Sequence, residues 1–308
     1  MSLDRLLKQG DRAVERVIAG REREVIRAYS QALVNIRKQI ASAYEKHAVK
    51  GELTFAEMSK YNRLARLEKG VEEELRKLAS RQGIKVKGAV RTVFQDSYYR
   101  TAYAFENTAQ IKLGFGKLNP KVIEAAIYNP FDPLKWSDRL REHTRLLDRR
   151  IREEITQGLI QGKPYSEMAR RIKDPMDKTA YKAVRIIQTE CHRVQVDGRL
   201  SAFDDAEDAG VEFSRIWTAT LDDATREEHQ DMDGEEANED GYFDLDGDMV
   251  RGPGLTGIAE HDINCRCNVI AQIKGYEPKV RMAREKLGEK GELISYKNYA
   301  EWEKSRIK

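Results

Sequence analysis

Four side chains near the end of the sequence are of the types that bind zinc, and their order suggests a single site. Cys265 and Cys267 are separated by one residue, His261 stands four positions before Cys265, and His229 comes earlier in the chain. Thiolate and imidazole groups are preferred ligands of zinc, which usually binds four of them in a tetrahedron. One zinc ion is therefore one interpretation. The other is that the cysteines alternate at the start of a strand, with one in the core, and that His229 bonds to a nearby aspartate.

Carboxylates close to His229 also allow a catalytic interpretation. His229 with Asp222, Asp223 and Asp233 could supply the general base and the metal ligands of a nuclease. The alternative is a polar network that fixes an irregular loop, whose backbone amides must find hydrogen-bond partners. We favour the network.

Two other polar patterns have simple structural explanations. The segment 244–248 imitates the start of a calcium-binding EF-hand loop, but its glycine comes two positions early and Leu255 stands where a glutamate is needed. An acidic surface turn explains it better. A polar set on one side of a predicted helix comprises Arg185, Thr189, Glu190 and Arg193. Ion pairs within the helix explain it more simply than a nucleotide or phosphate site.

The composition indicates long solvated helices and two regions of opposite charge. Of the 308 residues 40% are apolar, enough for a core, and 35% are charged, above the usual level. Residues 1–100 contain 22 Lys/Arg against 13 Asp/Glu, whereas residues 201–250 contain 2 against 18. We expect the first region to attract DNA without sequence preference and the second to repel it or to hold cations.

Targeting signals are missing from the sequence. It has no apolar run long enough for a transmembrane helix, and its first residues lack the apolar segment of a secretory signal. Its three cysteines are too few and too unevenly placed for a disulfide framework. We therefore expect no membrane contact and a reducing, cytoplasmic environment during synthesis.

Apolar residues in the first 209 positions recur every three or four residues, which predicts long helices. Lys50 and Gly51 should end the first helix, and Thr54 with Glu57 resembles the capping box of the next. The first predicted stripe consists of Val14, Ile18, Val25, Tyr29, Leu33, Ile36, Ile40 and Tyr44.

Further breaks divide the remaining helical sequence. Gln82 and Gly83 should end a second helix, and a third should span about 86–112. Glycines and prolines then cluster in 114–133, which we interpret as a hinge between two helical portions. Helices resume over 134–209.

After Gly210 the pattern changes to alternation and loops. Short strands are predicted near 211–219 and 268–273, separated by a long polar segment. The expected fold is mainly α with a small α+β module near the C-terminus. The predicted domains are a helical N-terminal region (1–115), a second domain combining helices 134–209 with an α+β module 210–275, and a basic helical tail (276–308).

An ordered set of polar and aromatic residues runs through the second predicted domain. It comprises Thr189, Glu190 and Arg193 on a helix, Trp217 on a strand, Asp222, Thr225, Arg226, His229, Asp233 and Gly234 in a loop, and Asn264, Cys265 and Cys267 before the last strand. The set, with the Asn-Cys-Arg-Cys sequence at its end, resembles the Mu F-like head morphogenesis family of tailed bacteriophages. The resemblance covers roughly 134–275.

The resemblance implies a structural minor head protein, present in few copies in the virion, rather than an enzyme. Its implied partners are the portal, scaffold or major capsid protein and double-stranded DNA, with a role in head assembly, genome packaging or genome exit. The protein would be made in the host cytoplasm. Two alternatives stay open: a zinc- or metal-dependent nuclease or hydrolase that acts on DNA, and a DNA-binding protein without catalysis. No cofactor is expected apart from the one zinc ion considered above.

Overall fold

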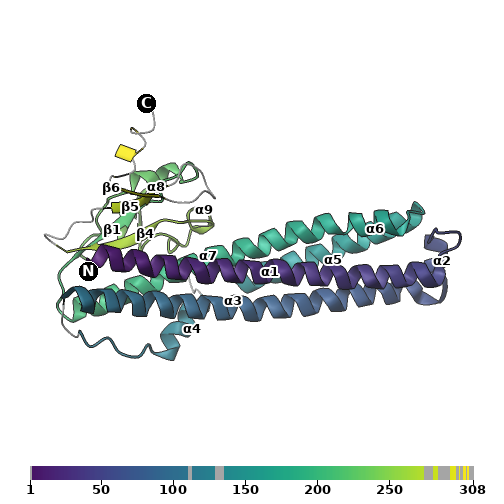
Figure 1. Cartoon of the computed structure of the whole chain (residues 1–308), viewed down its shortest axis with the longest axis horizontal. Helices are drawn as coiled ribbons and strands as arrows, with labels where there is room; N and C mark the ends of the chain where they lie inside the picture. Colours follow the sequence, from purple (N-terminus) through teal and green to yellow (C-terminus); the bar gives the residue numbers. More distant parts are fainter. Residues whose placement is uncertain are drawn as a thin grey trace. The chain divides into compact units, whose positions relative to one another are not determined.

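A computed structural model describes residues 2–109, 113–128, 135–273, 280–283, 292–295, 298, 301, 302 and 304 (Figure 1). As predicted, it is mainly helical with short strands near the C-terminus. The helices are α1 Leu3–His47, α2 Phe55–Ser59, the 3-10 turn η1 Lys60–Asn62, α3 Arg63–Ala109, α4 Pro120–Tyr128, α5 Trp136–Ile160, α6 Tyr165–Arg171, α7 Lys173–Asp208, α8 Glu227–Asp231 and α9 Ala259–Asp262. The strands are β1 Ser214–Thr218, β2 Phe243–Leu245, β3 Asp248–Val250, β4 Asn268–Gln272, β5 Val280–Ala283 and β6 Glu292–Ser295. No described helix has both the length and the apolar character that crossing a membrane requires.

Two compact units are each assembled from separate stretches of the chain. Unit 1 combines Met1–Ile18, Ala89–Pro133 and Gln188–Lys308, and unit 2 combines Ala19–Gly88 and Leu134–Ile187. The divisions fall inside α1, α3 and α7, so each of these helices contributes to both units. The predicted domains, in contrast, are continuous stretches, and their boundaries at 134 and 275–276 fall outside the described residues.

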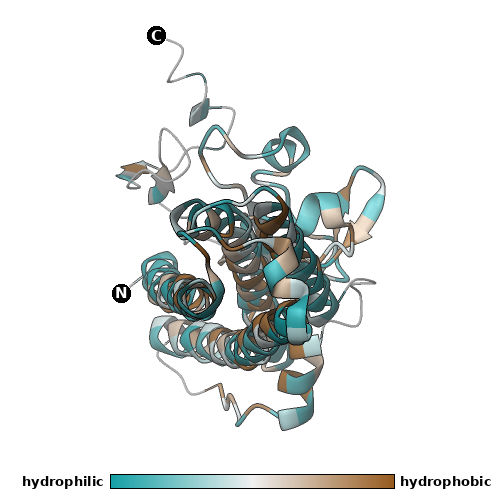
Figure 2. Cartoon of the chain, turned by 90° about the vertical axis from the view of Figure 1, so that its right-hand side faces the viewer, coloured by the Kyte–Doolittle hydropathy of each residue, from teal (hydrophilic) through white to brown (hydrophobic). Residues whose placement is uncertain are grey.

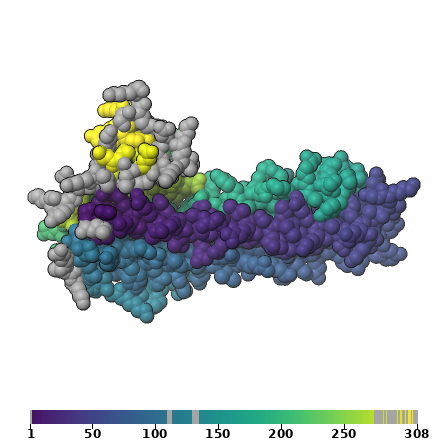
Figure 3. Space-filling model, in the orientation of Figure 1, coloured from purple at the N-terminus to yellow at the C-terminus, as the bar shows by residue number. Residues whose placement is uncertain are grey.

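Unit 2 is a bundle in which parts of α1, α3 and α7 lie beside α5 and α6 (Figure 1). Apolar residues face the inside of the bundle (Figure 2), and α1 and α3 lie against each other on the face in Figure 3. The predicted stripe explains this packing, because Val25, Tyr29, Ile36 and Ile40 are all buried. Polar contacts add to it: both Nε and Nη2 of Arg37 donate to the carbonyl of Ala169, at 3.0 and 2.6 Å.

The connection after α1 follows the sequence prediction. Helix α1 ends three residues before Lys50, and Gly51 adopts a φ of 84°, a conformation that glycine reaches without steric strain. Thr54 caps α2, since its hydroxyl accepts from the backbone amide of Glu57 at 3.3 Å.

The predicted break at Gln82 and Gly83 is wrong, because α3 continues through both residues. A glycine inside a helix costs only about 1 kcal/mol. Burial of apolar residues on both sides of it, including Leu78 and Val86, outweighs that cost. The end of the predicted third helix, 110–112, lies outside the described residues.

The predicted hinge 114–133 contains a helix, α4, whose Ile123, Ala126 and Ile127 are buried. Pro120 is the first residue of α4, a position where proline costs no hydrogen bond. Residues 129–134, including two of the prolines that suggested a hinge, lie outside the described part of the chain.

Strands β1 and β4 form the antiparallel pair at the centre of the C-terminal module, close to the two predicted strands. Trp217 lies opposite Val269 and Ile216 opposite Ile270. Arg215 is also buried, and it is neutralised by Asp204 at 2.8 Å and by Glu207 at 2.6 Å.

The segment that imitates an EF-hand loop is a β-hairpin. Strands β2 and β3 pair antiparallel, and Asp246 and Gly247 turn the chain with φ values of 53° and 91°. The side chain of Asp244 accepts from the amide of Gly247 at 2.8 Å, which closes the turn. This agrees with the acidic surface turn that the sequence favours.

The C-terminal tail differs from the helix predicted over 276–308. Its described residues include β5 and β6, which pair antiparallel from Val280 opposite Ser295 to Ala283 opposite Glu292. Ala283 also bridges to Leu221. These long-range contacts override the local preference of a charged sequence for helix. Residues 301, 302 and 304 are helical, in agreement with the prediction for that part of the tail.

The core of unit 1 joins the N-terminus of α1 to the C-terminal module. Helices α3 and α7 approach closely there, since a Cβ atom on Gly198 would lie 2.5 Å from the carbonyl oxygen of Phe94. Only glycine fits at that crossing. The core includes Leu3, Leu7, Phe105, Val196, Phe203, Trp217, Phe243, Cys265, Cys267 and Val269.

Candidate metal centre

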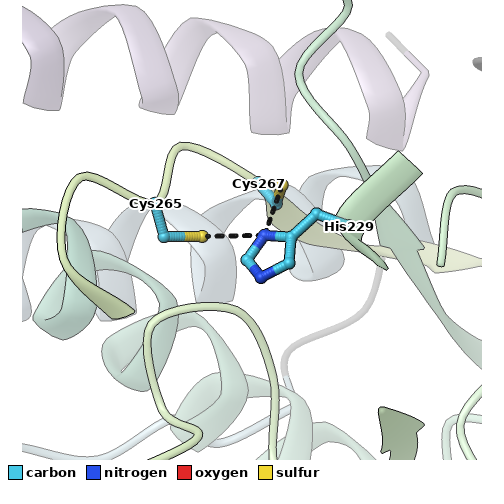
Figure 4. Close-up of side chains that lie close together, drawn as sticks. All are labelled: His229, Cys265 and Cys267. Carbon is cyan, nitrogen blue, oxygen red and sulfur yellow. Dashed lines mark hydrogen bonds between the residues drawn. The ribbon is translucent and has the colours of Figure 1, made fainter. Parts of the chain in front are cut away.

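His229, Cys265 and Cys267 point their ligand atoms toward one another in the C-terminal module (Figure 4). The Nδ1 atom of His229 is 3.7 Å from the sulfur of Cys265 and 3.5 Å from the sulfur of Cys267. All three ligand atoms lie within 4.8 Å of one another. The three side chains are 1, 3 and 2% exposed, respectively, so the cluster is closed to solvent.

Two short segments position these side chains. His229 lies on α8, and both cysteines lie between α9 and β4. Arg226, the residue before α8, donates to the carbonyl of Ile263 at 2.5 Å and so ties the two segments together. Asn264 has a φ of 59°, a left-handed conformation that asparagine tolerates better than most residues. This turn directs the following cysteines inward.

The two thiols differ electrostatically. The hydrogen bond from Cys265, with contributions from the His229 ring and the backbone amide of Thr220, holds the pKa of Cys267 well below its usual value. The hydrogen bond with Cys267 and burial raise the pKa of Cys265, although the backbone amide of Cys267 acts in the opposite direction. Cys267 is thus the thiol that more readily becomes a thiolate.

His261, the fourth ligand in the sequence prediction, does not belong to the converging group. Its ring stacks on that of His229, with centroids 5.4 Å apart and planes 18° apart. Its Nδ1 is buried and has no hydrogen-bond partner among the described residues. The position of His261 four residues before Cys265 could not show that its side chain lies beside the group, because the direction of that side chain is set by helix α9.

Asp222 is fully buried and pairs with Arg266, the residue between the two cysteines. Both carboxylate oxygens accept from the guanidinium, one at 2.8 Å from Nη2. The same carboxylate accepts from the amide of Ala224 at 3.1 Å, and Thr225 hydroxyl bonds to it at 3.3 Å. Asp222 therefore joins the loop before α8 to the cysteine segment.

Asp233 forms a second buried ion pair with a distant residue of unit 1. Its carboxylate accepts from Arg281 of β5 at 2.8 Å and from the backbone amide of Ala219 at 2.7 Å. Gly234 follows, and its amide donates to the carbonyl of Trp217 at 2.9 Å. Asp233 and Gly234 therefore add hydrogen bonds along the edge of β1, and Asp233 links this edge to β5 in the tail.

The aromatic residue of the motif lies directly behind the cluster. Trp217 is fully buried, and its ring meets the ring of His229 edge-on with centroids 5.6 Å apart. It meets Phe243 at 5.4 Å in the same manner. Trp217 therefore provides the apolar wall against which His229 packs.

The motif residues on α7 connect the helix to the loops of unit 1. Glu190 and Arg193 form the ion pair expected within the helix, at 3.1 Å, and both are buried. Arg193 also donates to the carbonyl of Ala126 at 2.6 Å. The hydroxyl of Thr189 accepts from the amide of Asn264 at 3.3 Å.

Among the described residues, the carboxylates of the nuclease interpretation do not converge with His229. The carboxylates of Asp222 and Asp233 are engaged by arginines, and neither belongs to the group of converging ligand atoms found within the described ranges. Sequence reasoning missed the partners Arg266 and Arg281. Arg266 lies inside the predicted motif, but nothing in the local pattern of Arg281 indicates its partner.

Comparison of the sequence with known proteins identifies its family. The family model for "Phage Mu protein F like protein" matches residues 149–270. Minor head protein GP7 of Bacillus phage SPP1 is 33% identical over 298 residues, which cover 96% of each chain. The chain belongs to the phage Mu protein F-like family. No solved structure matches it significantly.

A second relative in this comparison carries the name of an enzyme. The NAD(+)–arginine ADP-ribosyltransferase EFV of Enterococcus faecalis is 29% identical over 287 residues. The alignment covers 93% of this chain but only 58% of that protein. The Mu F-like chain therefore corresponds to part of the larger relative.

Proposed function

We propose that this Mu F-like chain is a structural minor head protein of a tailed bacteriophage and resides in the virion. The observation that carries the proposal is the match to minor head protein GP7 along 96% of both chains. The match is therefore not confined to one domain of this chain. The ordered motif from Thr189 to Cys267 lies entirely inside the family match at 149–270.

The site geometry supports an architectural role of the motif rather than catalysis. Asp222, Asp233 and Arg226 each tie separate loop segments together, as described above. A general base and metal-binding carboxylates must instead remain available to a substrate and a metal ion. The enzyme name of the second relative does not extend to this chain, which spans 58% of that protein.

We further propose that the chain acts through contacts with other head components. The portal, scaffold and major capsid proteins are the partners to test, and double-stranded DNA is the proposed non-protein partner. The excess of Lys/Arg over Asp/Glu in residues 1–100 supports DNA contact. These contacts would serve head assembly and the packaging or exit of the genome.

The proposal is tested with virions of the phage that encodes the chain. Quantitative mass spectrometry of purified particles should find it in few copies relative to the major capsid protein. Co-expression with tagged portal, scaffold or capsid protein should recover it with one of them. Absence from purified virions would overturn the proposed location and role.

The nuclease alternative has its own assay. The wild-type chain should not cut DNA in the presence of Mg²⁺, Mn²⁺ or Zn²⁺. Cleavage by the wild type together with a folded but inactive His229→Ala variant would favour the nuclease instead.

A further inference from the structure

We propose that His229, Cys265 and Cys267 bind one zinc ion that cross-links α8 to the segment before β4. This site goes beyond the proposed head function and does not depend on it. It rests on four properties of the cluster: ligand spacing, charge, the hydrogen-bonding state of His229, and the surroundings of the sulfur atoms.

The spacing of the ligand atoms matches a tetrahedral zinc site. With Zn–S distances of about 2.3 Å and Zn–N distances of about 2.0–2.1 Å, tetrahedral geometry separates the sulfur and nitrogen atoms by about 3.6 Å. The two Nδ1–Sγ distances are 3.7 and 3.5 Å. Both nitrogen–sulfur distances thus fit a zinc site, and the two sulfurs lie within 4.8 Å of each other.

Charge also favours a divalent cation at this position. Two thiolates, a neutral imidazole and Zn²⁺ sum to zero, and a neutral cluster can be buried at low electrostatic cost. The donor set of two sulfurs and one nitrogen selects zinc over magnesium or calcium, which prefer oxygen ligands. No carboxylate belongs to the group of converging ligands found within the described residues.

His229 is poorly satisfied without a metal ion. Its Nδ1 faces two sulfur atoms, which are weak hydrogen-bond partners, and its buried Nε2 has no partner in the described part of the chain. Buried polar atoms are normally hydrogen-bonded, so such an imidazole needs an explanation. Coordination to zinc accounts for Nδ1, which points at two sulfur atoms; Nε2 is then the protonated nitrogen and has no acceptor among the described residues.

The alternative explanation treats the cysteines as small apolar core residues. It accounts for their burial but not for the direction of His229. Backbone amides also approach both sulfurs, that of Thr220 at Cys267 and that of Cys267 at Cys265. Outer hydrogen bonds of this kind orient metal ligands and stabilise thiolates.

Burial indicates that the ion is structural rather than catalytic. The three ligands are almost completely enclosed, whereas a catalytic zinc keeps an open coordination position for water or substrate. The ion would stabilise the short elements that it joins, because α8 has only 5 residues and few contacts of its own can hold it in place. His261 lies beside the group with its ring stacked on His229, so it could supply a fourth ligand only by turning out of that stack.

The test measures zinc in the full chain after expression in zinc-supplemented medium and gel filtration. The wild type should carry about one zinc per chain, and Cys265→Ser and Cys267→Ser should lose it. Cys191→Ser is the matched control, since Cys191 is also a buried cysteine outside any disulfide but lies on α7, away from the group. This control should retain the wild-type zinc content.

A ligand exchange keeps the test decisive if the serine variants fail to fold. His229→Cys should retain zinc, because a thiolate can replace the imidazole, whereas His229→Ala should lose it. Cobalt substitution of the wild type should give the absorption of a tetrahedral Co²⁺ with thiolate ligands. Wild-type protein without zinc and without that cobalt spectrum, or serine variants that retain the full zinc content, would overturn the proposal.

Discussion

Single polar residues connect the loops of the C-terminal module around its apolar core. Asp222 bonds to the cysteine segment through Arg266, and Arg226 bonds to the same segment through Ile263. Asp233 bonds to the tail through Arg281. Each of these residues joins positions that are far apart in the sequence, so each contributes to the module as a cross-link rather than as part of a local turn.

Asp222 offers the sharpest test at this scale. Asp222→Asn keeps the shape of the side chain but removes the charge that Arg266 requires, and it should lower the free energy of unfolding by about 2–3 kcal/mol. Chemical unfolding measured by circular dichroism or by Trp fluorescence would report the change. Asp231→Asn is the control, since Asp231 is exposed on α8 and should leave stability within about 0.5 kcal/mol of wild type. Equal stability of both variants would contradict the cross-linking role.

Among the elements, α3 and α7 are positioned by a close crossing within unit 1. Gly198 leaves no room for a side chain, because the carbonyl of Phe94 occupies the place of its Cβ. The conflict is with backbone, which cannot rotate away as a flexible side chain would. The glycine of α7 is thus a packing requirement rather than a helix break.

Two glycine substitutions should have opposite effects. Gly198→Ala should destabilise the protein by about 1–3 kcal/mol, because it forces the two helices apart. Gly83→Ala should stabilise it by about 0.5–1 kcal/mol, because Gly83 lies inside α3 and a Cβ there meets nothing within 4 Å. Melting curves of both variants, measured in parallel, would show this. Changes of the same sign would disprove the assigned helix crossing.

At the scale of the whole molecule, charge is separated along the chain. Residues 1–100 carry a net positive charge, and residues 201–250 carry 18 acidic residues. Basic side chains bind the DNA backbone by releasing condensed counterions, a contribution that does not depend on base sequence. The acidic segment repels the same polymer.

DNA binding should therefore be weak, independent of sequence and strongly dependent on salt. Affinity for duplex DNA, measured by fluorescence anisotropy, should fall steeply between about 50 and 200 mM salt. The double variant Arg23→Glu with Arg27→Glu should weaken binding, since both arginines are exposed on α1. Glu239→Lys with Asp240→Lys should strengthen it. Binding that does not change with salt concentration, or that is lost in the Glu239→Lys, Asp240→Lys variant, would refute the proposed DNA contact.

The sequence determined most of the helices of this protein and the identity of its family. A helix is held by hydrogen bonds between residues four positions apart, so its apolar stripe is visible in the sequence itself. The stripe of α1 and the cap at Thr54 follow directly from this periodicity. The ordered motif from Thr189 to Cys267 likewise required no structure, because it depends on residue types and their order.

Tertiary structure alone decided which of these residues meet. His229 reaches Cys265 and Cys267 across more than thirty positions, while His261, only four residues from Cys265, lies beside the group. The pairing of β5 with β6 and the ion pair of Arg281 with Asp233 are equally invisible locally. Such contacts depend on the free energy of the whole packed module, in which distant segments compete for the same partners. Spacing in a sequence therefore predicts the donors of a metal site, and the fold selects which of them converge.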